Sequence, residues 1–219
     1  MRLIAIVTTL TPALLSAQGL LPAPTRWDVT LGNGSGLTSA SVGLVRTRDL
    51  LSGNRLRVGL GLRSTFVGGP VELTPAGAVN VPAGVVDTLQ LDAAALLLNV
   101  SGHFSLVLTR RLEAGLNIDL AGVGFGSSRA ASYRARPGGS ATSEQASPSS
   151  ANLFLYGSKD RGSLNSEFFG AWAATDRLTI RGGLSHQLVE YRADRKLTSN
   201  TDRFRQYANL LFVGARIRQ

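Results

Sequence analysis

Apolar and polar residues alternate one by one along several stretches of the chain. The clearest examples are residues 55–63, 112–120 and 178–188. In the first of these, every even-numbered position is Leu or Val, whereas the odd positions hold Arg and Gly. Consecutive side chains of a β-strand point to opposite faces, whereas a helix would need apolar residues three and four positions apart. These stretches are therefore predicted to be strands.

Turns and loops of two kinds separate the alternating stretches. Short polar turns lie at residues 51–54, 109–111 and 175–177. Longer segments rich in Pro, Gly, Ser and Ala lie at residues 69–87 and 129–150, and a shorter polar connection lies at 194–203. Short turns at one end and long loops at the other are typical of outer-membrane barrels.

This scheme predicts eight strands. They are Arg26–Asn33, Leu37–Arg48, Arg55–Val67, Thr88–Leu108, Leu112–Ser127, Ser163–Ala174, Leu178–Arg192 and Phe204–Ile217. The fourth strand is long enough that a bulge is expected near residues 99–102. Residues 152–157 are either a ninth short strand or an extension of the sixth, and the extension is favoured because an even, closed count leaves no edge.

The N-terminus has the layout of a secretory signal peptide. A positive start, Met1-Arg2, precedes an apolar run over residues 3–15, and small residues follow at 16–17. The alternative is a short N-terminal helix of the mature domain. Residues 1–17 are predicted to be the signal peptide and 18–219 the barrel domain, so the chain is expected to work outside the cytoplasm. No later stretch is apolar enough for a transmembrane helix.

Composition excludes several classes of function. Without any Cys and with only two His, the chain can form neither a disulfide scaffold nor a thiolate or His-rich metal site, and no metal or cofactor is expected. The net charge of +9 invites a nucleic-acid interpretation. No nucleic-acid-binding motif is present and the compartment is wrong, so nucleic acid is not expected as a partner.

The polar faces of the strands distinguish a membrane barrel from a soluble one. A water-facing strand usually carries Lys and Glu, whereas these faces carry Gly, Asn, Thr and Ser with isolated charges of both signs. Such faces suit a narrow lumen in which each charge finds a partner. The expected lumen cluster is Arg57, Arg63, Glu113, Asn117, Asp119, Glu167 and Arg181. The predicted fold is a closed antiparallel up-and-down transmembrane β-barrel of eight strands, and the alternative is a soluble secreted β-barrel or sandwich.

Aromatic residues fall near the predicted strand ends. Trp27 and Trp172 lie at the short-turn end, and Phe66, Phe125, Tyr191 and Phe204 lie at the long-loop end. Two aromatic girdles are what membrane interfaces select, so these six are the expected interface aromatics.

Three phrases carry a resemblance to a known class. Residues 57–63 (RVGLGLR), 114–119 (AGLNID) and 162–169 (GSLNSEFF) are similar to those of small eight-stranded Gram-negative outer-membrane barrels of the OmpA/OmpX type. The resemblance implies an outer-membrane location, a monomer, and assembly by the outer-membrane machinery. Such barrels commonly end on an aromatic residue, whereas this chain ends on residues 216–219 (RIRQ), with Phe212 the nearest aromatic.

Two groups of residues invite a chemical interpretation. Ser185, His186 and Glu190 suggest a catalytic triad, but neighbouring strand residues face opposite ways, so Ser185 and His186 cannot pair and no enzyme is expected. His103 is expected to be a lone interface residue. Basic residues of the long loops could bind the phosphates of outer-leaflet glycolipid. They are Arg129, Arg134, Arg136, Arg195 and Lys196.

The favoured function is structural or interactive. Eight strands enclose a lumen just wide enough for side chains, so a filled barrel that contacts glycolipid or an external partner through basic loops is expected. The alternatives are a narrow conduit for small or hydrophobic solutes and a lipid-modifying barrel enzyme.

Overall fold

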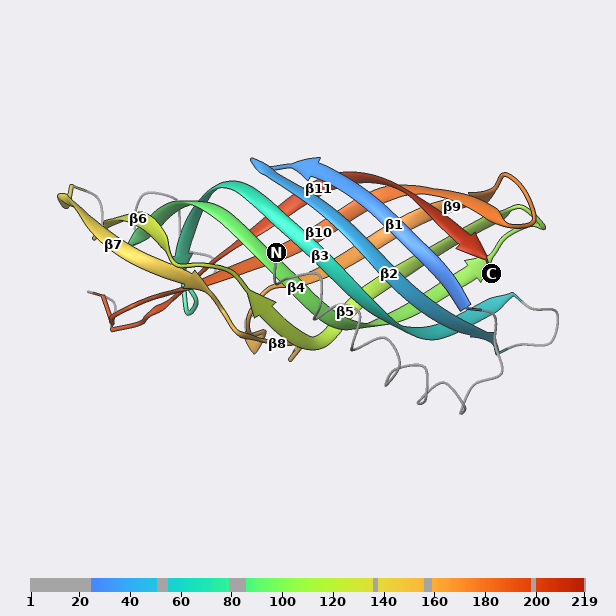
Figure 1. Cartoon of the computed structure of the whole chain (residues 1–219), viewed down its shortest axis with the longest axis horizontal. Helices are drawn as coiled ribbons and strands as arrows, with labels where there is room; N and C mark the ends of the chain where they lie inside the picture. Colours follow the sequence, from blue (N-terminus) through green and yellow to red (C-terminus); the bar gives the residue numbers. More distant parts are fainter. Residues whose placement is uncertain are drawn as a thin grey trace, which may run out of the picture.

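The computed structural model describes residues 25–50, 55–78, 86–135, 138–155, 159–197 and 200–218. These residues form one antiparallel sheet of eleven strands that curls into a long barrel (Figure 1). The strands are β1 (Thr25–Gly34), β2 (Leu37–Asp49), β3 (Leu56–Pro75), β4 (Thr88–Val107), β5 (Leu112–Phe125), β6 (Arg129–Arg134), β7 (Ala141–Pro148), β8 (Ala151–Leu153), β9 (Leu164–Ala173), β10 (Leu178–Ala193) and β11 (Arg203–Arg218). The predicted signal peptide over residues 1–17 lies outside the described residues. Within the described part, no helix has the length and apolarity needed to cross a membrane.

Eight of the strands close a ring, as the sequence predicts. Each pairs with the next in the order β1, β2, β3, β4, β5, β9, β10, β11, and β11 returns to β1 with Trp27 opposite Ile217. A closed ring leaves no unpaired strand edge, which is what crossing a membrane with strands requires. This transmembrane ring contains the end of the barrel at which the short turns and the C-terminus lie (Figure 1).

A second ring continues the barrel at the end opposite the short turns, which is called the upper end from here on. The β1–β2 hairpin stops at a tight turn in which Ser35 and Gly36 both have positive φ, 49° and 79°. Above that turn, β11 pairs directly with β3 through Phe204–Pro75. On the other side, the β6–β7 hairpin joins β4 to β10 through Thr88–Arg134 and Tyr191–Pro148. The six strands β3, β4, β6, β7, β10 and β11 thus form a closed ring, here called the head.

The two faces of the sheet exchange their chemical character between the rings. Lower on β4, inward positions such as Asn99 and His103 are polar and Phe104 points outward. Higher on the same strand, Leu89 and Leu91 are buried inside while Gln90 is exposed. Apolar outside and polar inside suits lipid, whereas the reverse suits water. The head is therefore folded like a water-soluble barrel on top of a membrane barrel.

The apolar core of the barrel lies in the head. It is built from buried side chains of all six head strands, together with Leu37 and Leu197. Tyr133 donates a hydrogen bond of 2.8 Å from its hydroxyl to Asp87, and its ring packs edge-on against Phe204 at 6.1 Å. This core fixes the β6–β7 hairpin in place.

The head corrects two of the predicted loops. Residues 69–75 belong to β3, and most of residues 129–150 form β6 and β7. Pro70 is tolerated because the Glu72 N–H, two residues on, points away from β4 to Gln206 (3.0 Å). The backbone nitrogen of Pro70 points to the same side of β3 as that of Glu72, and β2 has already ended there. The missing N–H of Pro70 therefore removes no hydrogen bond between strands.

The length of β4 also has a different cause from the one expected. Its pairing with β5 does shift between Val100 and Ser101, within the predicted bulge region, but the extra residue is Leu120 of β5. β4 itself runs unbroken for 20 residues because its upper half belongs to the head. The short strand β8 pairs with residues 121–123 of β5, whose opposite edge is taken there by β4. It therefore lies on the edge of β5 that β9 occupies at residues 112–118 and continues the line of β9, in agreement with the favoured extension.

Candidate functional site

The lumen of the transmembrane ring holds a chain of charged side chains that alternate in sign. Each member contacts the next through at least one ion pair. In order they are Asp49, Arg57, Glu113, Arg216, Asp28, Arg181, Glu167, Arg63 and Asp119. They come from seven of the eight ring strands, so the chain crosslinks the wall of the barrel from within.

Glu167, Arg63 and Asp119 form one end of this chain of ion pairs. Arg63 Nη2 lies 2.5 Å from Asp119 Oδ1, and its Nη1 lies 2.7 Å from Glu167 Oε1. All three side chains are buried, with Asp119 completely so. Because removal of one partner would leave a buried charge uncompensated, each of these contacts constrains the position of the strands that carry them.

Arg181 and Arg216 share the carboxylate of Asp28. Arg216 Nη2 lies 2.9 Å from Asp28 Oδ2, and Arg181 Nη1 contacts the same oxygen. The Arg181 guanidinium also lies over the ring of Phe169, 4.3 Å from its centroid. An aromatic face attracts a cation, so Phe169 adds to the stabilisation of a charge that has almost no contact with solvent.

Amide side chains complete the hydrogen bonding of the buried carboxylates. Asn117 donates to Glu167 at 2.8 Å, and its carbonyl oxygen lies 2.5 Å from His103 Nδ1. Asn99 donates to Asp119 at 2.8 Å, as does the backbone N–H of Asn165 at 3.0 Å. Hydrogen bonds of this kind offset the cost of removing carboxylates from water.

Side chains fill this lumen. The cavity among Asp28, Thr30, Arg63, Glu167 and Arg181 has a volume of about 10 Å³. Such a volume accommodates about one water molecule. Among the described residues, no three of His, Asp and Glu gather in a group that could hold a metal ion. The arrangement favours a paired structural network over a transport path.

All seven residues of the expected lumen cluster lie in this network. The structure adds the titratable residues Asp28, Asp49, His103 and Arg216, which the sequence pattern did not single out for the lumen, and the amide of Asn99. Asp28 lies between the outward Trp27 and Val29, so the period-two pattern contained the signal that places it inside. His103, expected at an interface, is 1% exposed and stacks on Phe169 inside the lumen at 5.6 Å.

The Ser, His and Glu of strand β10 are not brought together. Ser185 Oγ points inward and donates to Asn165 at 2.7 Å. His186 points outward and stacks on Tyr207 at 5.3 Å. Glu190 is 2% exposed and accepts hydrogen bonds from the Ser149 hydroxyl and the Gly162 N–H, and Arg203 lies 2.7 Å away. No triad forms from these three residues.

Of the five expected glycolipid contacts, the four that the structure describes lie in the head. Arg134 and Lys196 are exposed, and Arg195 contacts Glu144 of β7. Arg129 is half-buried on the inward-facing side of β6, so it is not the outward contact that was expected. Arg136 lies outside the described residues.

Four of the six expected interface aromatics lie on the outer wall. Trp27, Phe66, Phe125 and Trp172 are between 39% and 53% exposed. Tyr191 and Phe204 are completely buried in the head core instead. Both side chains point inward, as the alternation along their strands requires, but at their level the inner face of the sheet is the apolar one.

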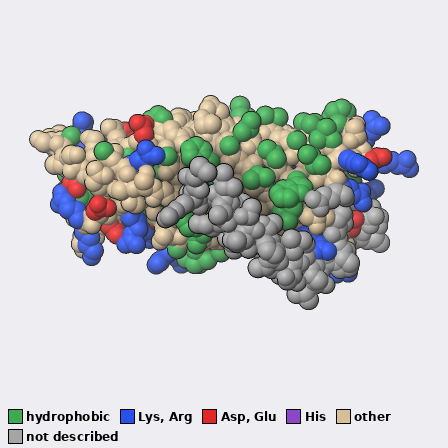
Figure 2. Space-filling view, viewed as in Figure 1, with side chains coloured by type: hydrophobic (Ala, Val, Ile, Leu, Met, Phe, Trp, Pro, Cys, Tyr) green, Lys and Arg blue, Asp and Glu red, His purple; other side chains and the backbone are tan. Residues whose placement is uncertain are grey.

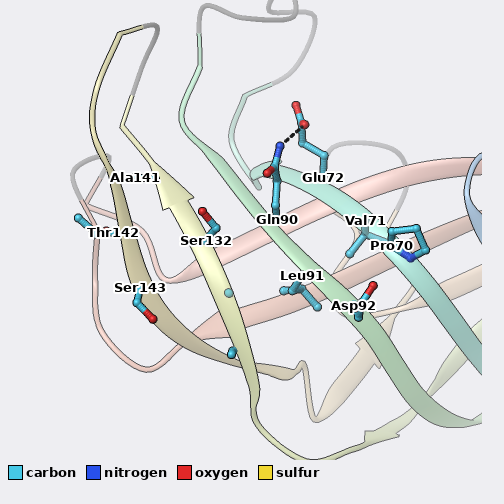
Figure 3. Close-up of a pocket in the computed structure, with 12 residues that line it drawn as sticks. Pro70, Val71, Glu72, Gln90, Leu91, Asp92, Ser132, Ala141, Thr142 and Ser143 are labelled. Carbon is cyan, nitrogen blue, oxygen red and sulfur yellow. Dashed lines mark hydrogen bonds between the residues drawn. The ribbon is translucent and has the colours of Figure 1, made fainter.

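The outer wall of the head carries a groove of about 730 Å³ where β3, β4, β6 and β7 twist past one another (Figure 3). Glu72 and Asp92 line it and are both exposed. Gln90 donates to Glu72 across the wall at 2.7 Å, and small residues such as Ser132 and Ser143 form the opposite side. The lining mixes polar with apolar residues in equal number and contains no Lys or Arg.

Comparisons with known proteins return fold neighbours only. No family model and no curated protein matches the chain. Among solved structures, a major outer membrane protein from Thermus thermophilus matches with 14% identity and a TM-score of 0.43, covering 91% of this chain and 100% of that one. Neisserial surface protein A matches with 12% identity and a TM-score of 0.36, over 90% and 96%. The Yersinia pestis outer membrane protein Ail in a bilayer nanodisc matches with 9% identity and a TM-score of 0.38, over 90% and 99%. At these identities and TM-scores the likeness assigns no ligand or activity.

The location follows from the molecule itself. Hydrophobic side chains cover the middle of the outer wall, and charged ones gather toward the ends (Figure 2). Leu31, Leu60, Phe168, Leu211 and Val213 are all more than 50% exposed on that belt. A closed antiparallel ring that turns apolar residues outward and polar residues inward is the architecture of proteins that span the outer membrane. The chain is therefore an eight-stranded β-barrel of the outer membrane.

Proposed function

We propose that this barrel anchors its head outside the cell as a rigid surface for contact with an external partner, and that it neither conducts solutes nor catalyses a reaction. The observation that carries the proposal is the second ring. Six strands close above the membrane around a core of their own, so the head is a folded platform and not a set of loops.

The filled lumen supports the same proposal. The alternating ion pairs between Asp49 and Asp119 occupy the space that a conduit would need. Above them, the interior of the head is packed with apolar side chains such as Leu73, Leu89 and Leu210. A solute moving along the barrel axis would have to displace both layers.

The geometry shifts the expected contact away from lipid phosphate. Arg134 is opposite Thr88, eight residues beyond the outward-facing Leu96 on β4. At about 3.4 Å per residue and with the usual strand tilt, Arg134 lies roughly 20 Å further from the membrane than Leu96. The head is therefore better placed to meet sugars or a protein beyond the bilayer than phosphates at its surface.

Single-cysteine labelling tests the orientation of the head. The sequence contains no Cys, so Ser143→Cys in the head and Asp176→Cys in a short turn each give one thiol. Both positions are exposed. A membrane-impermeant maleimide should label Ser143→Cys on intact cells and Asp176→Cys only after the outer membrane is broken. The reverse pattern would place the head in the periplasm and overturn the proposal.

Planar-bilayer recording tests the absence of a path. The reconstituted protein should show no steady ion current at voltages where an open channel of similar strand number would conduct. Stable openings would favour the conduit instead.

A further inference from the structure

Arginine side chains surround the end of the barrel that carries the short turns. Six of them are exposed there: Arg48, Arg55, Arg110, Arg111, Arg177 and Arg218. Figure 2 shows Lys and Arg side chains gathered at this end. Within the described part of the chain, none of the six has a carboxylate at ion-pair distance, although Asp176 lies in one of the turns. In the lumen, by contrast, Arg57, Arg63, Arg181 and Arg216 each contact at least one carboxylate.

Two of the turns hold their arginines in the same way. In one, the Thr109 hydroxyl accepts the N–H groups of Arg111 (3.2 Å) and Leu112 (3.0 Å). In the other, Thr175 accepts those of Arg177 (3.2 Å) and Leu178 (3.0 Å). Thr-x-Arg-Leu is thus used twice, 66 residues apart, with the arginine directly before the first outward-facing Leu.

Ladder hydrogen bonds fix these positions relative to one another. The Arg111 carbonyl accepts the Ala173 N–H at 2.8 Å, and the Arg177 carbonyl accepts the Arg218 N–H at 2.9 Å. Arg218 is in turn the register partner of Arg26. Like charges opposite one another on a sheet destabilise it, so the Arg26–Arg218 pair calls for a counter-anion beside it.

The neighbours of these arginines identify that anion. Leu112 next to Arg111, and Ile217 next to Arg218, are 46% and 48% exposed on the membrane belt. One residue along a strand is about 3.4 Å, so the arginines begin where the hydrocarbon ends, at the level of lipid phosphates. Guanidinium groups bind phosphate oxygens in pairs. We propose that the turn end of the barrel binds the phosphate groups of anionic phospholipids in the leaflet that it faces.

The test measures lipid selectivity in vesicles. The purified barrel is reconstituted in phosphatidylcholine containing a minor share of spin-labelled phosphatidylglycerol or, separately, spin-labelled phosphatidylcholine. Phosphatidylglycerol should be enriched at the protein surface by about five-fold, the ratio that one arginine near an anionic surface supports, and the enrichment should fall as salt is added. Equal association of the two lipids with the wild-type barrel would overturn the proposal.

A matched pair of variants locates the effect. Arg111→Gln/Arg177→Gln/Arg218→Gln should lose most of the enrichment, whereas Arg134→Gln/Lys159→Gln/Lys196→Gln, which removes the same charge at exposed positions away from this end, should keep it. Equal loss in both variants would reduce the effect to net charge and reject the site. Heat-modifiable migration on gels checks that each variant is folded. If a variant does not fold, the salt dependence of the enrichment at the wild-type barrel still tests the proposal. Because both leaflets of the vesicle have the same composition, the result depends on insertion in a membrane and not on the proposed role of the head.

Discussion

Phe204 on β11 lies opposite Pro75 on β3, although β1 and β2 separate these two strands lower in the barrel. This contact closes the head on one side. On the other side, Tyr191 lies opposite Pro148 and connects β10 to the β6–β7 hairpin. An eight-stranded ring thus becomes a six-stranded one without leaving an open edge, because two strands are added where four have ended. The head is consequently expected to unfold as a unit of its own.

Phe204→Ala should loosen the head and leave the transmembrane ring intact. Removing a completely buried phenylalanine from an apolar core costs about 3–5 kcal/mol. The head should then become sensitive to proteinase K between residues 129 and 148, while heat-modifiable migration on gels persists. Phe66→Ala is the control, because Phe66 is 49% exposed on the membrane belt and contributes nothing to the head core. If the two variants were cleaved alike, the head would not have an independent core.

Glu167→Gln should destabilise the transmembrane ring. Glu167 contacts Arg63 at 2.7 Å and Arg181 at 3.0 Å, and a neutral amide leaves these two buried cations short of one negative charge. The loss should be of the order of 3 kcal/mol in the free energy of unfolding. Urea titration of the barrel in detergent, followed by its migration on unheated gels, measures it. Glu72→Gln removes an exposed carboxylate of the head and should leave the midpoint unchanged.

The period of two was sufficient to predict the eight-stranded ring and its lumen. Alternation placed Arg63, Asp119 and Glu167 on one face of their strands, and closure of the ring brought them together because an eight-stranded barrel is narrow. Their exact partners could not be predicted, since these depend on the register between strands that are far apart in sequence.

The head was missed because its signal is an exchange of faces within a strand. On β4, residues 89–92 are apolar at odd positions, and residues 104–106 are apolar at even ones. Between them, residues 93–98 are apolar on both faces, since the interior has already become apolar while the exterior still faces lipid. If the same face of a strand is assumed to be apolar along its whole length, this stretch is predicted to be an irregular strand, and Tyr191 and Phe204 are predicted to be interface residues.

Glu144 should titrate below its ordinary value. The Arg195 guanidinium hydrogen-bonds its carboxylate, which lowers the pKa of Glu144 below 4.5. A carboxyl group with a lowered pKa in the folded state stabilises the fold above its unfolded pKa, and this contribution is lost as the pH falls through the folded one. Arg195→Gln should therefore return the pKa of Glu144 toward 4.5. Carbon-detected NMR titration of the Glu144 carboxyl measures both values, and an unchanged pKa would show that the pair does not form in solution.

Gly183→Ala should weaken the ring far more than Gly170→Ala, although both glycines lie where β9 pairs with β10. A Cβ on Gly183 would meet the carbonyl oxygen and carbon of Phe168 well inside van der Waals contact, and backbone atoms in a ladder cannot move aside. A Cβ on Gly170 would meet nothing within 4 Å. Overpacking of this kind costs about 1–3 kcal/mol, whereas the added methyl at residue 170 would point into lipid at almost no cost. Unfolding of the two variants in urea, measured against the wild type by gel migration, should give a lower midpoint for Gly183→Ala alone. Equal midpoints would mean that β9 and β10 approach less closely at residue 183 than the ladder between Gly183 and Phe169 requires.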